Sequence, residues 1–169
     1  MTSWIPDPLH PAVVHFPIAL SVLVPLLALL VLFALARSFV PERAWAVVVL
    51  AQALLVGSAW LAHDTGHDEE ERVERVVDEH YIEQHGEAAN WMLWLGVGAL
   101  ALVAAGLLPG RAGRIARIAG AASTLIVLTA AVRVGHLGGK LVYEHGAASA
   151  YIHPAQPDGV DASPAEPPK

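Results

Sequence analysis

The sequence contains no cysteine and only two methionines, Met1 and Met92. Without cysteine the chain cannot form disulfides or iron–sulfur clusters, or attach c-type haem, which needs a C-x-x-C-H motif. The shortage of methionine excludes a methionine-rich copper(I) site. Basic residues are also scarce, because ten lysines and arginines stand against sixteen carboxylates and give a formal net charge of −6. A chain of this charge is not expected to bind nucleic acid.

Long apolar runs dominate what is present. A helix needs about 20 mostly apolar residues to cross a bilayer core about 30 Å thick. Four runs meet this length, near residues 12–36, 44–62, 91–108 and 115–137. They predict an all-α integral membrane protein, an up-down-up-down four-helix bundle within residues 1–149 that contacts membrane lipid. Residues 150–169 are rich in proline and alanine and predict a disordered tail.

The charges between these runs predict the orientation. Arg37 and Arg43 lie between the first two runs, and three more arginines lie at 111–117. The segment 64–87 instead holds ten carboxylates and two arginines. The positive-inside rule then predicts a multi-pass protein of the bacterial inner membrane with both termini in the periplasm. Within the acidic segment, apolar residues recur at three- and four-residue steps, which predicts an extra amphipathic helix over about residues 69–85 in the outer loop.

All nine histidines lie on the predicted outer side: His10, His15, His63, His67, His80, His85, His136, His145 and His153. At about 1.5 Å of rise per helical residue, four of them fall in one layer about 28–36 Å from the arginine end, one on each helix. These are His15, His63, His85 and His136. His10, His80 and His145 form a second layer at about 40–44 Å. Imidazoles at matched depth on facing helices are the ligands that haem b requires.

We therefore predict His15, His85, His136 and His145 as haem ligands, with Arg133 orienting or neutralising a propionate. A second interpretation is a Zn or Cu ion bound by the same histidines with Asp64 or Glu144. Further metal ligands under this interpretation are His10, His63, His67 and His80. His63 and His67 are four residues apart, which is metal-ligand spacing if the second helix continues past Asp64. A third interpretation is an accessory subunit of a larger membrane complex, whose histidines merely lie at the interface.

Two segments carry a family resemblance: LHPAVVHFPIAL at 9–20 and GHLGGKLVYEHGA at 135–147. With a histidine opening the third span, they resemble the bacterial domain of unknown function 2231, over about residues 8–147. The resemblance implies four spans and no established activity. Members are sometimes fused to Rieske-type or cytochrome-c-type domains, which implies electron transfer on the outer face. The family-like positions here are His10, Pro11, His15, Phe16, Pro17, His85, Gly138, Gly139, Tyr143, His145 and Gly146. The histidines of the acidic segment inherit no role from the family.

The sequence thus predicts a membrane haem b protein that transfers electrons, acting as a carrier or subunit rather than as a stand-alone enzyme. The expected partners are a membrane quinone and a cytochrome c, a Rieske-type protein or a larger membrane complex. No acidic residue suited to proton relay lies within the spans, which argues against a pump.

Overall fold

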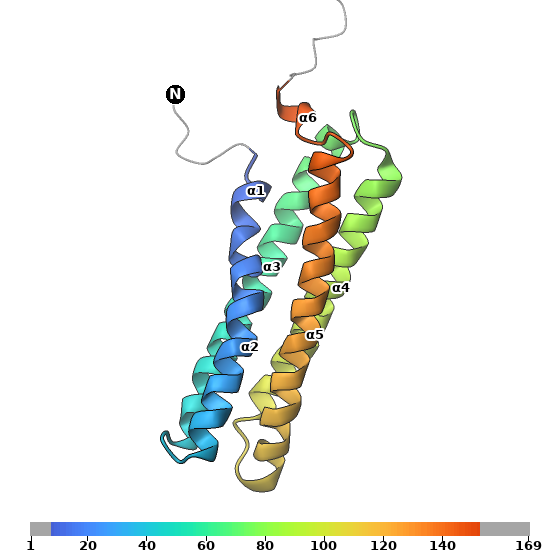
Figure 1. The fold of residues 1–169 in the computed structure, drawn as a ribbon. Helices are drawn as coiled ribbons and strands as arrows, with labels where there is room; N and C mark the ends of the chain where they lie inside the picture. Colours follow the sequence, from blue (N-terminus) through green and yellow to red (C-terminus); the bar gives the residue numbers. More distant parts are fainter. Residues whose placement is uncertain (1–7, 153–169) are drawn as a thin grey trace, which may run out of the picture.

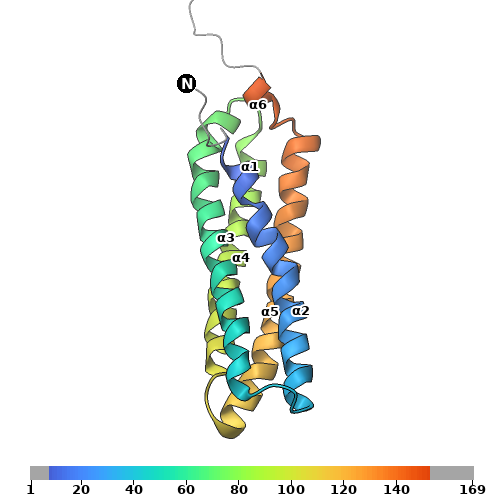
Figure 2. The same cartoon turned by 90° about the vertical axis from the view of Figure 1, so that its left-hand side faces the viewer.

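The computed structural model describes residues 8–152, and every regular element in this range is a helix. The elements are α1 (His10–Val13), α2 (His15–Ala36), η1 (Glu42–Trp45), α3 (Ala46–Val73), α4 (Glu79–Ala105), α5 (Gly110–Tyr143) and α6 (Ser149–Ile152). The four long helices alternate in direction and form one elongated bundle (Figure 1). The first and last described residues lie at the same end of the bundle, beside the α3–α4 turn (Figure 2). The predicted all-α fold is confirmed.

Four helices are long and apolar enough to cross a membrane, and each contains one of the runs predicted from the sequence. Large aliphatic and aromatic side chains cover the outside, as lipid contact requires; Leu23, Leu30 and Trp91 are among the most exposed. With 34 residues, α5 extends about 51 Å, well beyond a hydrocarbon core of about 30 Å. The helix ends therefore project out of the membrane.

Each long helix packs against two neighbours, in the cyclic order α2, α3, α4, α5. The helices α2 and α4 are therefore diagonal partners across the bundle axis, and α1 lies above α2 and packs on α3. The central core is built from Val24, Leu55, Met92 and Val127 together with alanines. Small residues on the inner faces allow the helix backbones to approach closely.

The acidic segment is helical, but it does not form a separate helix over 69–85. Instead α3 continues to Val73, the chain reverses, and α4 begins at Glu79. Asp78 caps α4 by accepting a hydrogen bond from the backbone N–H of His80 (2.9 Å). Val77 is buried beneath the turn. The amphipathic pattern therefore belongs to the ends of two antiparallel helices. Residues 153–169, including His153 and most of the predicted tail, lie outside the described range.

Buried polar contacts close the opposite end of the bundle, which we call the arginine end. The Arg117 side chain is 7% exposed; it donates to the Gly106 carbonyl from Nε (2.7 Å) and to Glu42 Oε2 (2.9 Å). The fully buried Trp45 donates from Nε1 to the Val103 carbonyl (2.8 Å). A Cβ at position 106 would collide with the Trp45 ring. These contacts join η1, α4 and α5, and they explain why an arginine is tolerated at the start of the fourth span.

Candidate functional site

Two imidazoles meet near the bundle axis at the end that carries α1, α6 and the α3–α4 turn, which we call the histidine end. His10 lies in α1 and His85 in α4, on diagonally opposed elements. Their ring centroids are 6.5 Å apart and their planes are nearly perpendicular, at 85°. Both rings are partly buried. Within residues 8–152 the other histidine–histidine ring contact joins His63 and His67, which lie on the same helix.

The backbone fixes the hydrogen-bonding state of both rings. His10 Nδ1 lies 2.8 Å from the Ala62 carbonyl oxygen. Because a carbonyl only accepts, Nδ1 donates and Nε2 keeps a lone pair. His85 interacts with the Val134 backbone, while its Nδ1 is buried without a hydrogen-bond partner among the described residues. The His10 ring is therefore held by a backbone carbonyl at Nδ1 with Nε2 unused, as in many metal-bound histidines, and the His85 ring keeps a buried Nδ1 without a partner among the described residues.

Two glycines on the remaining helices make room for these rings. A Cβ at Gly66 of α3 would lie 3.1 Å from His10 Cε1. A Cβ at Gly138 of α5 would lie 3.1 Å from His85 Cε1. Both distances are shorter than an ordinary carbon–carbon contact of about 3.5–4.0 Å. All four helical walls of the bundle therefore contribute to the site, two through imidazoles and two through glycine notches.

The other predicted ligands lie elsewhere. His15, His136 and Arg133 are exposed on the outside of α2 and α5. The predicted layer of His15, His63, His85 and His136 is therefore not gathered at one point, and only His85 of these four lies beside another helix's histidine. The physical reason is rotation, because residues five apart on a helix point about 140° apart. His10 and His15 have this separation and cannot both face the axis.

The remaining histidines form local contacts. His63 and His67 lie one turn apart on α3, with centroids 4.8 Å apart, and His67 Nδ1 is 2.8 Å from Glu70 Oε2. His80 is exposed and its Nε2 is 2.8 Å from Gln84 Nε2. His145 stacks on Tyr81 at 3.8 Å between centroids. This stack borders a small cavity of about 70 Å³ that Lys140 also lines.

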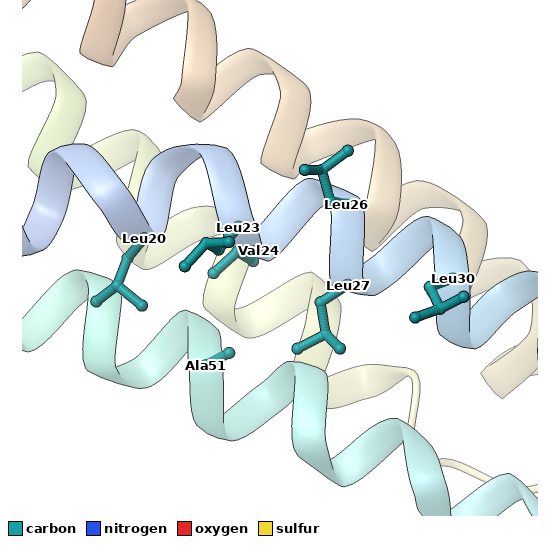
Figure 3. Close-up of a pocket in the computed structure, with 7 residues that line it drawn as sticks. All are labelled: Leu20, Leu23, Val24, Leu26, Leu27, Leu30 and Ala51. Atoms are coloured by element: carbon teal, nitrogen blue, oxygen red, sulfur yellow. The ribbon is translucent and has the colours of Figure 1, made fainter.

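An apolar groove lies away from the histidines. It is an open groove of about 400 Å³ between α2 and α3, lined by Leu20, Leu23, Val24, Leu26, Leu27, Leu30 and Ala51. Leu20 and Leu27 point toward α3, as Figure 3 shows. The lining offers no donor, acceptor or ionisable group. Lipid chains would fill such a groove in a membrane, and we assign it no chemistry.

The donor count separates the two predicted types of centre. Within residues 8–152 no group of three or more histidine, aspartate or glutamate side chains is arranged around a common point. A structural or catalytic zinc site takes three or four such donors, whereas a bis-histidine haem would be held by two. His10 and His85, with ring centroids 6.5 Å apart on diagonally opposed elements, are the residues that would hold it.

Comparison with known proteins identifies a family and nothing more specific. The family model described as "Predicted membrane protein (DUF2231)" matches residues 6–150. No curated protein and no solved structure matches the chain. The matched range contains both members of the central histidine pair and both glycine notches.

Proposed function

We propose that this chain, which belongs to the DUF2231 family of predicted membrane proteins, binds haem b through His10 and His85 and transfers electrons at the histidine end of the bundle. The observation that carries this proposal is the buried, unpartnered Nδ1 of His85 beside a second imidazole across the axis. A buried polar atom without a partner costs about 1–3 kcal/mol, so its retention calls for an explanation. A bound metal centre supplies one.

Two imidazole donors are the number that a bis-histidine haem b takes, and both come from helical segments. His10 opens the first span, because α1 passes through Val14, whose backbone angles are helical, directly into α2. Gly66 and Gly138 give the two imidazoles the room they need beside the adjoining helices. His10 therefore replaces His15 as the proposed ligand from the first helix.

The proposed haem site has two ligands and two backbone groups beside them. His10 and His85 bind the iron, and the carbonyl of Ala62 and the backbone of Val134 orient their rings. Haem would supply reversible one-electron redox chemistry at this site. The positively charged Lys140 at the same end is 3.8 Å from Glu144 and is placed to balance added negative charge.

The proposed setting is the bacterial inner membrane, with the histidine end facing the periplasm. Support comes from charge, because arginines gather in the loops of the arginine end whereas the α3–α4 turn region is acidic. Electrons would enter from a membrane quinol or a partner complex and leave to a cytochrome c or a Rieske-type protein. The acidic surface around the α3–α4 turn would attract a basic electron acceptor.

A pair of cysteine variants tests this orientation, since the natural chain has no cysteine to interfere. Ser38 lies in the loop after α2 at the arginine end, and Ser149 lies in α6 at the histidine end. A maleimide that does not cross membranes should label Ser149→Cys in spheroplasts and leave Ser38→Cys unlabelled until the membrane is permeabilised. The opposite pattern would invert the proposed orientation.

A visible spectrum of purified full-length protein, before and after dithionite reduction, tests the function. We expect a Soret band and a reduced α-band, either as purified or after haemin addition. His10→Ala and His85→Ala should each abolish the six-coordinate spectrum, whereas His15→Ala and His136→Ala, which change exposed imidazoles, should retain it. Loss in the second pair with retention in the first would refute the assignment. A protein that never binds haem would refute the function, and co-purifying subunits would then favour the accessory interpretation.

A further inference from the structure

A second histidine pair, the half-buried His63 and the exposed His67, lies on one face of α3. His63 and His67 have metal-ligand spacing only if the second helix continues past Asp64. It does, because α3 runs without interruption from Ala46 to Val73. Gly66 does not break it. The two imidazoles therefore project from successive turns of one helix, and their centroids are 4.8 Å apart at an interplanar angle of 65°.

This spacing suits two ligands of one metal ion. With metal–nitrogen bonds of about 2.0–2.1 Å and an angle of about 90–110° at the metal, the centroids of two bound imidazoles lie about 4.5–5.2 Å apart. The observed 4.8 Å falls within that range. The central pair, at 6.5 Å, is too widely spaced for such cis coordination. The two pairs thus suit different centres.

Glu70 orients the His67 ring and leaves its Nε2 available to bind a metal. Its Oε2 lies 2.8 Å from His67 Nδ1, so the carboxylate accepts the Nδ1 proton and Nε2 is left with a lone pair. A carboxylate–histidine–metal chain of this kind both orients the ring and raises its basicity. The His67 side chain is 65% exposed, which leaves it open to ions from solution. Neighbouring carboxylates at 64, 68, 69 and 71 add a negative potential that concentrates cations.

We propose that His63 and His67 chelate one divalent transition-metal ion at the surface of the histidine end, with Glu70 as a positioning residue and water completing the coordination. Among divalent first-row ions Cu²⁺ binds imidazole most strongly, and Zn²⁺ follows. With two protein ligands the proposed site is a surface site completed by water, unlike a structural or catalytic zinc site with three or four protein ligands. It does not depend on haem at His10 and His85.

Titration of tag-free, metal-free full-length protein in nanodiscs with Cu²⁺ tests the proposal. We expect one bound Cu²⁺ whose electron paramagnetic resonance spectrum shows coupling to two imidazole nitrogens. His63→Ala and His67→Ala should each weaken binding at least tenfold and reduce the coupling to one nitrogen. Glu70→Gln should weaken binding about tenfold while both nitrogens remain coupled.

His80→Ala is the matched control. His80 is an exposed histidine at the same end, next to Tyr81 and paired with Gln84 instead of a second imidazole. It should leave Cu²⁺ affinity unchanged. Affinity that survives both His63→Ala and His67→Ala within twofold, or that falls equally in His80→Ala, would overturn the assignment. The haem spectrum, recorded on the same variants, should not change, so failure here is distinguishable from failure of the proposed function.

Discussion

The glycine notch at position 138 gives the sharpest test of how the central site is packed. Replacing glycine by alanine inside a helix is worth about 0.8–1.0 kcal/mol in helix propensity. At Gly138, however, the new methyl group would lie 3.1 Å from His85 Cε1, several tenths of an ångström too close. Overpacking of this kind costs about 1–3 kcal/mol. We therefore expect Gly138→Ala to gain nothing or to lose stability, and to displace the His85 ring.

Gly139→Ala is the control, because it changes the next residue of the same helix and its Cβ would meet nothing within 4 Å. Its stability should increase by the full glycine-to-alanine difference in helix propensity, about 0.8–1.0 kcal/mol. The two variants should then differ by about 2 kcal/mol in free energy of unfolding, or about 4–8 °C in thermal midpoint for a chain of this size. Thermal unfolding in one detergent, followed by circular dichroism, measures the difference. Equal midpoints would show that His85 does not occupy the notch, and the description of the site would fail.

Three further variants test other parts of the bundle. Gly66→Ala, whose Cβ would lie 3.1 Å from His10 Cε1, should unfold several degrees below Gly57→Ala, whose Cβ meets nothing; equal midpoints would remove His10 from the axis. Trp45→Phe should lose about 1–2 kcal/mol with the bond to the Val103 carbonyl, seen as a lower midpoint, and an unchanged midpoint would contradict that bond. Gln52→Leu should change the thermal midpoint by no more than a few degrees, because it removes the bond from Nε2 to the Gly96 carbonyl (3.0 Å) together with an Oε1 that is buried without a partner among the described residues; a larger fall would refute this.

The fold followed from hydropathy alone. Four runs of about 20 apolar residues admit few arrangements besides an antiparallel bundle when the connections are short. What hydropathy could not give was the division of the acidic segment. Its amphipathic spacing fits one helix over 69–85 as well as two helix ends joined by a turn. Asp78, which caps α4, is the residue that decides between them, and its role depends on a contact that spacing does not reveal.

The site was predictable only in part, because depth and direction are separate quantities. The rise of about 1.5 Å per residue places histidines at a height, and the turn of about 100° per residue decides which of them faces the axis. The buried residues of the first span (α1 and α2) and of α4 show the inward faces. They are Val13, Pro17, Ser21, Val24 and Ala28 in the first span, and Ala88, Met92, Gly96, Ala99 and Val103 in α4. His10 and His85 extend these stripes by three residues each. His15 does not.

The positions of small residues identify the inward helix faces, which the depth of a histidine along its helix does not. Gly138 lies seven residues, or two turns, after the buried Ala131, and Gly66 lies four residues after the buried Ala62. Each glycine therefore continues an inward face at the height of an inward histidine. A ring at the axis needs an adjoining helix without a side chain, so an inward histidine and an inward glycine at one height specify the site together. The eight histidines within residues 8–152 do not form one common centre; the rotation of each helix divides them, and among them only His10 and His85 meet across the axis.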